Sequence, residues 1–164
     1  MADGYVLPPR AGHRIRGAGM MLKVGAEQSG RWSAFEAEVA PGFDVGAHRH
    51  AEAEEIFYLL EGELDLLAFE PRTTAPGDWT AWESADGARV VRGGPGSLMF
   101  VPAGCPHAFT NPGAAPAGCC SWSRRPATSS TWRGSQSCSA APGRRIRPRS
   151  SNCGPATTSS SLRP

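Results

Sequence analysis

Long hydrophobic segments are absent from this sequence. Nowhere do 18 apolar residues follow one another, and the N-terminal segment, residues 1–17, has no apolar run of signal-peptide length. We therefore expect a cytoplasmic protein with no membrane partner. The 164 residues are enough for one domain and too few for two ordinary ones, so a single core is expected.

Acidic residues are absent after Asp86, although the chain has 15 of them. Nine of the 17 basic residues lie before residue 116, so that part carries six more negative than positive charges, and the eight that follow are all arginine. The C-terminal arginines have no aromatic interleaving beyond Trp122 and Trp132, and no helix-turn-helix precedes the strand-rich part of the sequence that begins near residue 18. We therefore expect no nucleic-acid partner.

Residues 116–164 are poor in large apolar side chains as well. They contain no Val or Phe, and Ile146 and Leu162 are their large aliphatics. Such a segment cannot bury enough apolar surface to offset an ordering entropy of about 1–2 kcal/mol per residue, which predicts a disordered tail. Four of the five cysteines fall here and only Cys105 precedes them, so no disulfide framework or CxxC metal site is indicated.

A frameshift is the second interpretation of this segment. If residues 118–139 are back-translated with codons ending in G or C and read one base earlier, they can encode Leu-Leu-Leu-Val-Val-Ala-Pro-Ala-Gly-His-Glu-Gln-His-Leu-Ala-Gly-Leu-Ala-Glu-Leu-Leu. That reading is a buried strand followed by an amphipathic helix. Serine has several codons and the shifted reading needs particular ones, so the disordered tail and the frameshift both remain open.

Short strands separated by Gly and Pro are indicated from residue 18 onward, because no helical apolar spacing exceeds about two turns. Many short strands with regular turn signals indicate an all-β sandwich or barrel, which we place at residues 18–115. The expected strands are 20–24, 32–39, 45–50, 56–60, 63–69, 89–92, 97–101 and 107–110.

A polar, turn-rich loop, residues 71–87, interrupts these strands and contains Trp79 and Trp82. Long loops in small domains often carry function, so one interpretation is a lid whose two indoles contact substrate. The other is a surface loop whose indoles pack on the barrel wall.

Histidine is scarce, with four in the chain, and three of them fall in two spaced motifs. The first runs from Gly42 to Gly62 and reads G-x5-H-x-H-x4-E-x6-G, with His48, His50 and Glu55 at the named positions. Two histidines two apart on a strand point to the same side. Glu54 satisfies a looser form of the spacing, but Glu55 keeps six residues before the closing glycine and is preferred.

The second motif runs from Gly96 to Asn111 and reads G-x5-P-x-G-x2-H-x3-N, where Pro102 and Gly104 form a turn that directs His107. The two motifs together resemble the two signature motifs of the cupin superfamily. This resemblance implies the cupin double-stranded β-helix, a jelly-roll-like barrel. It also implies that His48, His50, Glu55 and His107 bind one divalent metal ion.

Imidazole and carboxylate ligands suit Fe, Mn, Ni, Zn, Cu or Co, and ligand type alone does not choose among them. Four protein ligands leave two positions of an octahedral ion for a small substrate, or for substrate and dioxygen. We expect an apolar lining around it, although residues of this kind are more often plain core than substrate contacts: Phe57, Leu59, Met99, Val101 and Phe109. A strand edge left unfinished predicts a homodimer.

Cupins carry many chemistries, so the fold does not determine the reaction. The leading hypothesis is a dioxygenase-like enzyme acting on a small oxygen-rich molecule, with Glu55 as the catalytic residue as well as a ligand. A non-redox isomerase, cyclase or decarboxylase is the second hypothesis, with the metal as Lewis acid. A module that binds a small ligand without turnover is the third.

Overall fold

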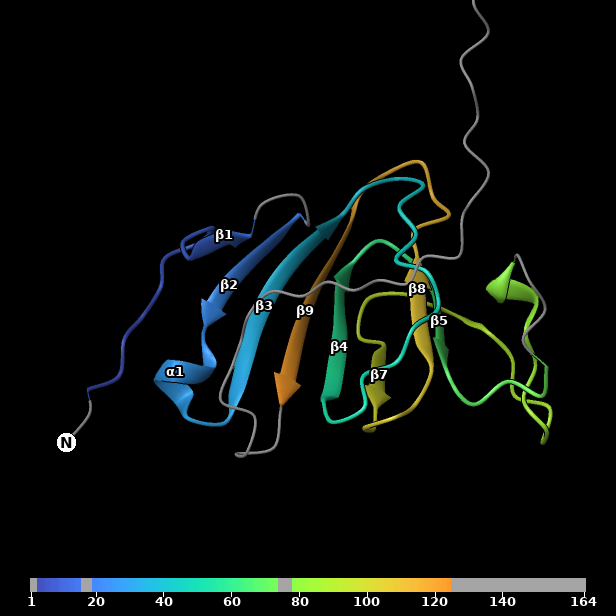
Figure 1. Cartoon of the computed structure of the whole chain (residues 1–164). Helices are drawn as coiled ribbons and strands as arrows, with labels where there is room; N and C mark the ends of the chain where they lie inside the picture. The colour runs from blue at the N-terminus through green and yellow to red at the C-terminus, as the bar shows by residue number, and fades with distance from the viewer. Residues whose placement is uncertain (1–2, 16–18, 74–77, 125–164) are drawn as a thin grey trace, which may run out of the picture.

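The structure is a computed structural model that describes residues 3–15, 19–73 and 78–124. Most of its elements are short strands (Figure 1). In chain order the elements are β1 (His13–Ile15), β2 (Met20–Val24), α1 (Ala26–Ser29), β3 (Trp32–Val39), β4 (Glu54–Glu61), β5 (Leu64–Ala68), the 3-10 turn η1 (Trp79–Ala81), β6 (Val91–Gly93), β7 (Leu98–Val101), β8 (His107–Thr110) and β9 (Ala117–Arg124).

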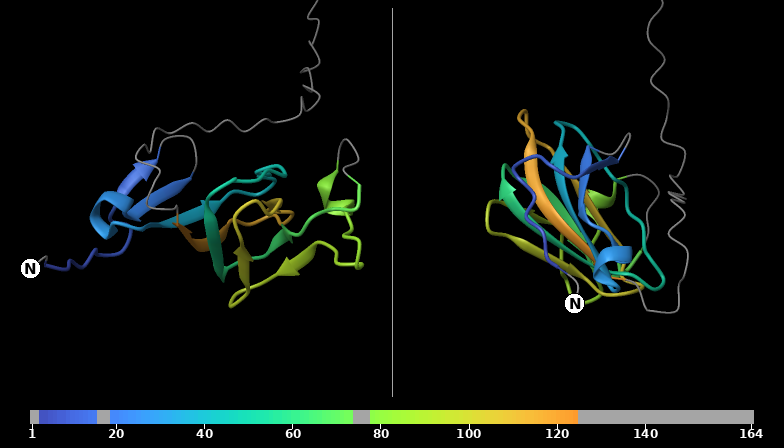
Figure 2. Two further views of the ribbon diagram at one scale, coloured as in Figure 1. Left: turned by 60° about the horizontal axis from the view of Figure 1, so that its bottom comes forward. Right: turned by 90° about the vertical axis from the view of Figure 1, so that its left-hand side faces the viewer.

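The strands form two antiparallel sheets, which confirms the all-β prediction. The larger sheet has the order β1-β2-β3-β9-β4-β7, and the smaller has the order β6-β5-β8. In Figure 1 the larger sheet runs across the molecule from β1 to β7, with β5 and β8 beyond β7; the views of Figure 2 show the two sheets from other sides. No helix in the described part is long and apolar enough to cross a membrane.

Alternating side chains give the larger sheet a buried inner face and an exposed outer face. On β3, Phe35, Ala37 and Val39 are buried, whereas Trp32 and Glu38 are exposed, because successive side chains of a strand point to opposite faces. The inner face and the smaller sheet enclose the main core: Ala37, Val39, Leu59, Leu64, Leu66, Met99, Val101, Ala117 and Cys119.

The barrel extends past residue 115, where the sequence placed its end. Strand β9 lies in the middle of the larger sheet and pairs with β3 from Trp32 to Val39 and with β4 from Glu54 to Glu61. Asn111, 1% exposed, fixes the approach to β9, because its amide donates to Val39 O and Ala115 O at 2.9 Å each. The prediction of a disordered tail is therefore wrong for residues 117–124; its remainder lies outside the described residues.

Two other expected boundaries differ from the structure. Strand β1 pairs with β2, so the sheet begins before residue 18. Residues 45–50 form no continuous strand, and two isolated bridges, Asp44 with Thr110 and His48 with His107, connect this part of the chain to β8. Gly46, with φ of +73°, turns the chain between these two bridges and prevents a regular strand there.

Candidate metal centre

The two motifs meet across one antiparallel bridge. His48 N donates to His107 O at 3.0 Å, and His107 N donates to His48 O at 2.9 Å, so the two histidines lie directly opposite each other. The turn at Pro102, closed by Cys105 N donating to Pro102 O at 3.1 Å, leads into His107. Gly104 N also donates to His50 O at 2.8 Å, which ties the second motif to the other histidine of the first.

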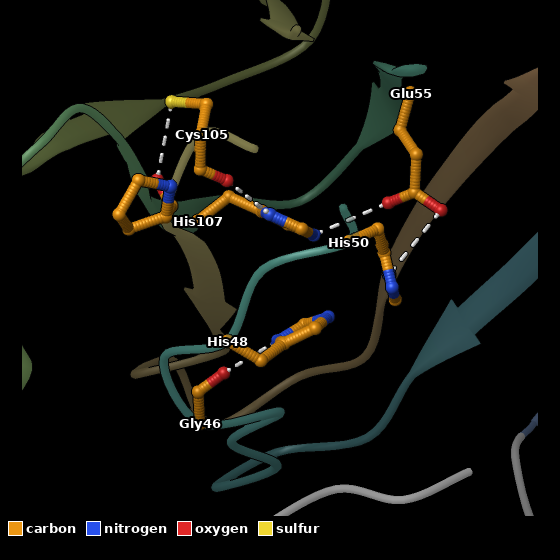
Figure 3. Close-up of polar contacts among 7 residues, drawn as sticks. Gly46, His48, His50, Glu55, Cys105 and His107 are labelled. Atoms are coloured by element: carbon orange, nitrogen blue, oxygen red, sulfur yellow. Dashed lines mark hydrogen bonds and ion pairs between the residues drawn. The ribbon is translucent and has the colours of Figure 1, made fainter. Parts of the chain in front are cut away.

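Three imidazoles converge at this bridge (Figure 3). His48, His50 and His107 each offer one nitrogen, and the three nitrogens all lie within 4.8 Å of one another. The rings of His48 and His107 are closest, with centroids 4.2 Å apart. A single ion can therefore be reached by all three side chains.

Glu55 completes the cluster, whereas Glu54 points away. The Glu55 carboxylate lies 3.2 Å from His107 Nε2 and 3.7 Å from His50 Nε2. Glu54 lies on the outer face of β4 and pairs with Arg124 at 3.1 Å, because consecutive residues of a strand face opposite sides. Between the two glutamates that the spacing allowed, the geometry favours Glu55.

Backbone carbonyls orient two of the imidazoles. Nδ1 of His48 lies 2.9 Å from Gly46 O, and Nδ1 of His107 lies 3.2 Å from Cys105 O (Figure 3). A carbonyl oxygen only accepts, so Nδ1 carries the proton in both rings and the Nε2 lone pair is left for another partner. Outer hydrogen bonds of this kind hold metal-binding histidines in proteins.

The donor set fits a metal ion. His107 is 1% exposed, and its Nε2 has no hydrogen-bond partner among the described residues, although Glu55 Oε2 is near. A buried polar atom left without a partner costs about 1–3 kcal/mol, and coordination of a cation would remove that cost. Three imidazoles and a carboxylate would hold a divalent transition metal, and the residues do not select which one.

The protonation states also suit a cation. Burial lowers the pKa of His48, which favours its neutral form. Burial acts to raise the pKa of Glu55, but the neighbouring histidines, His107 first, outweigh it and hold that pKa below its usual value. Metal binding requires neutral imidazole and ionised carboxylate, and the pKa shifts of His48 and Glu55 both act in that direction.

The apolar residues expected to line the site divide into two groups. Phe57 and Phe109 lie near it, with ring centroids 5.6 Å apart and Phe57 6.4 Å from His107. Leu59, Met99 and Val101 belong to the buried main core. For these three, the structure favours a packing role.

Trp79 and Trp82 lie on the other side of the smaller sheet. They pack with Leu67 and Ala108, which alternate with the inward residues of β5 and β8. Since Ala108 follows His107 on β8, the two indoles and the histidine occupy opposite faces. This position favours packing on the barrel wall over contact with substrate.

Asp44 and Gly46 were not expected to serve the site. Both residues act on His48 through hydrogen bonds. Gly46 O accepts from His48 Nδ1, and Asp44 Oδ1 accepts from Gly46 N at 2.7 Å. The one feature of the sequence that could have indicated this role is the glycine at position 46, whose φ in the structure is positive.

The fold and the site define a small β-barrel protein with a three-histidine cluster that can hold a metal ion. The family model described as Cupin matches residues 22–123, and the chain belongs to the cupin superfamily. This confirms the family resemblance carried by the two motifs. No curated protein matches the chain by sequence.

Several solved structures share the fold at low sequence identity. The protein TT1209 from Thermus thermophilus is 22% identical over 70% of this chain and 90% of its own, with a TM-score of 0.51. The cupin domain of Cnp3 from Schizosaccharomyces pombe is 14% identical over 75% of this chain and 69% of its own, also with a TM-score of 0.51. A predicted oxalate decarboxylase from Thermotoga maritima is 20% identical over 73% of this chain and 92% of its own, with a TM-score of 0.48.

Proposed function

We propose that this cupin binds one divalent transition-metal ion through His48, His50, Glu55 and His107 and acts as an enzyme on a small oxygen-rich molecule. The observation that carries the proposal is the buried His107 Nε2, which lacks a hydrogen-bond partner in the described part of the chain and faces the other donors. The metal would supply a Lewis acid and an assembly point for substrate oxygens.

Hydroxyl groups on the inner face support an oxygen-rich ligand. Ser123 lies directly opposite Glu55 on β9, and Ser33 lies opposite Ser123 on β3. Ser33 is buried and Ser123 is half-buried, on the positions of their strands that alternate with exposed ones. Hydroxyls in such a place can bind substrate oxygens that extend from the metal.

Dioxygenase chemistry is the leading reaction. Four protein ligands leave two positions on an octahedral ion, enough for a substrate oxygen and dioxygen. Both oxygen atoms enter the substrate, so the reaction balances without an external reductant. Glu55 is the residue of the set that could also accept a proton from a bound enol or phenol.

Metal analysis combined with oxygen uptake tests this function. We expect about one equivalent of transition metal per chain, and oxygen consumption equal to product formed with catechol or flavonoid candidates. Full turnover without air would replace the dioxygenase by a Lewis-acid isomerase, cyclase or decarboxylase. Stable metal content without turnover of any candidate would favour a binding module, and absence of metal affinity would overturn the proposal.

We also propose a homodimer, formed through the outer face of β4, β7 and β9. This face carries five large apolar side chains that are 38–60% exposed: Tyr58, Leu60, Leu98, Phe100 and Trp122. The strand register places them on neighbouring strands of one face, and a contiguous exposed apolar patch can mark an interaction site. Strand β7 is the edge of the larger sheet, so the patch reaches an edge available for pairing.

A further inference from the structure

The indole of Trp79 is tied to the segment that carries the first metal ligand. Its Nε1 donates to Asp44 at 3.0 Å from Oδ1 and 3.1 Å from Oδ2, across 35 residues of sequence. Trp79 is 4% exposed and is fixed by the cluster of Leu67 and Ala108. A rigid, buried donor therefore holds an otherwise exposed carboxylate in one orientation.

Asp44 passes this restraint to the metal centre through one glycine. Asp44 Oδ1 accepts from Gly46 N at 2.7 Å, and Gly46 O lies 2.9 Å from Nδ1 of His48. The bridge between His48 and His107 fixes the backbone of His48 but leaves its side-chain torsions free. The ring orientation of His48 thus depends on where the Gly46 carbonyl points.

We propose that Trp79 and Asp44 are positioning residues for the metal ligand His48, acting through Gly46. The inference rests on the proposed metal centre and gives Trp79, which packs on the other side of the smaller sheet, a role in orienting a metal ligand. Trp79 donates to Asp44, Asp44 orients the Gly46 peptide, and the Gly46 carbonyl holds the proton of His48 on Nδ1. His48 Nε2 is thereby kept as a lone pair directed at His50 and His107.

Trp82 provides a matched control. It lies in the same loop and packs against the same cluster as Trp79, but its buried Nε1 has no hydrogen-bond partner in the part of the chain that the structure describes. Phenylalanine at either position removes an indole N–H and similar volume. Only at position 79 does the change remove a hydrogen bond that leads to His48.

Cobalt(II) binding measures the effect on the centre. We expect Trp79→Phe and Asp44→Ala to raise the Kd for cobalt(II) about 10-fold and to alter the d–d spectrum of the bound ion, since outer hydrogen-bond partners of ligands contribute about 10–100-fold. Trp82→Phe should leave both unchanged. Asp44→Asn, whose amide oxygen can still accept from Gly46 N, should stay within about threefold of wild type.

The His48 tautomer, read by nitrogen-15 NMR of the metal-free protein, measures the effect without metal. Wild type should show Nδ1–H, and Trp79→Phe and Asp44→Ala should shift His48 toward a mixture of tautomers. Equal effects of Trp79→Phe and Trp82→Phe, or an unchanged tautomer and Kd in Asp44→Ala, would overturn the proposal. If wild type binds no cobalt(II) but the tautomer shifts as expected, the metal function fails and the positioning role stands. Asp44→Ala alters an exposed residue, so the test does not depend on Trp79→Phe folding.

Discussion

Glutamine substitution at the adjacent residues Glu54 and Glu55 tests the metal centre most directly. The two side chains are one residue apart on β4 but face opposite sides of the sheet, and only Glu55 contacts the histidines. Each substitution removes one negative charge and almost no volume. A difference between the two variants therefore reports the position of the charge.

The expected loss of metal affinity in Glu55→Gln follows from the distances at the site. Glu55 lies 3.2–3.7 Å from two histidine nitrogens, so an ion bound by those nitrogens would lie within about 4 Å of its charge. At an effective dielectric constant near 20, a unit negative charge at that distance contributes about 4 kcal/mol for each positive charge of the ion. The amide oxygen of Glu55→Gln can still coordinate and recovers part of it. A net loss of about 2 kcal/mol corresponds to about 30-fold in metal Kd.

Glu54→Gln should leave the metal Kd unchanged. Its side chain is 43% exposed and pairs with an Arg124 side chain that is 62% exposed, so its loss should change the free energy of unfolding by less than about 1 kcal/mol. Chelator competition gives both Kd values, and thermal melts check that both variants fold. The assignment is refuted if Glu54→Gln weakens metal binding as much as Glu55→Gln, or if Glu55→Gln binds metal within twofold of wild type.

Three further predictions concern the sheet. A chain that stops before Ala117 should lose cooperative unfolding by circular dichroism, because β9 pairs on both sides, whereas a chain that stops after Arg124 should keep it; equal behaviour would contradict the central place of β9. Phe100→Arg should convert a dimer into a monomer in light scattering, and a wild type that is already monomeric at high concentration would exclude the proposed interface. In that monomer, iodoacetamide at pH 8 should modify Cys120 well before Cys119, since burial raises the pKa of Cys119 to about 11; equal rates by peptide mass spectrometry would be incompatible with the register of β9.

The histidine cluster could be anticipated partly from the spacing within the first motif and partly from the resemblance of both motifs to those of cupins. His48 and His50 are two residues apart, and His107 follows a turn marked by Pro102 and Gly104, but only the resemblance to the cupin motifs implied that Glu55 and His107 join them. Strand alternation predicted a common direction for His48 and His50, whereas in the structure no regular strand holds them and the isolated bridge to His107 brings the first motif to the second. The choice between Glu54 and Glu55 could be settled only in the structure, because it depends on which face of β4 points inward.

Contacts between distant segments could not be anticipated in the same way. The hydrogen bond between Trp79 and Asp44 joins residues 35 apart, and no local pattern encodes it. Trp79 and Trp82 were equally compatible with a lid and with wall packing, because apolar character alone does not say which face of a sheet an indole covers. Their place became clear only from the alternation of His107 and Ala108 on β8.

Strand β9 contributes Ser123 to the proposed ligand site but none of the four proposed metal donors. Composition alone argued against order there, yet backbone hydrogen bonds to β3 and β4 satisfy a strand whatever its side chains. The shifted reading, Leu-Leu-Leu-Val-Val-Ala, would also form a strand at this place, with more apolar surface to bury. The sheet order and the four converging donors are therefore common to both readings. The hydroxyl of Ser123 opposite Glu55 belongs to the present reading alone, so restoring the shifted frame should stabilise the barrel, leave metal affinity intact and weaken binding of oxygen-rich ligands.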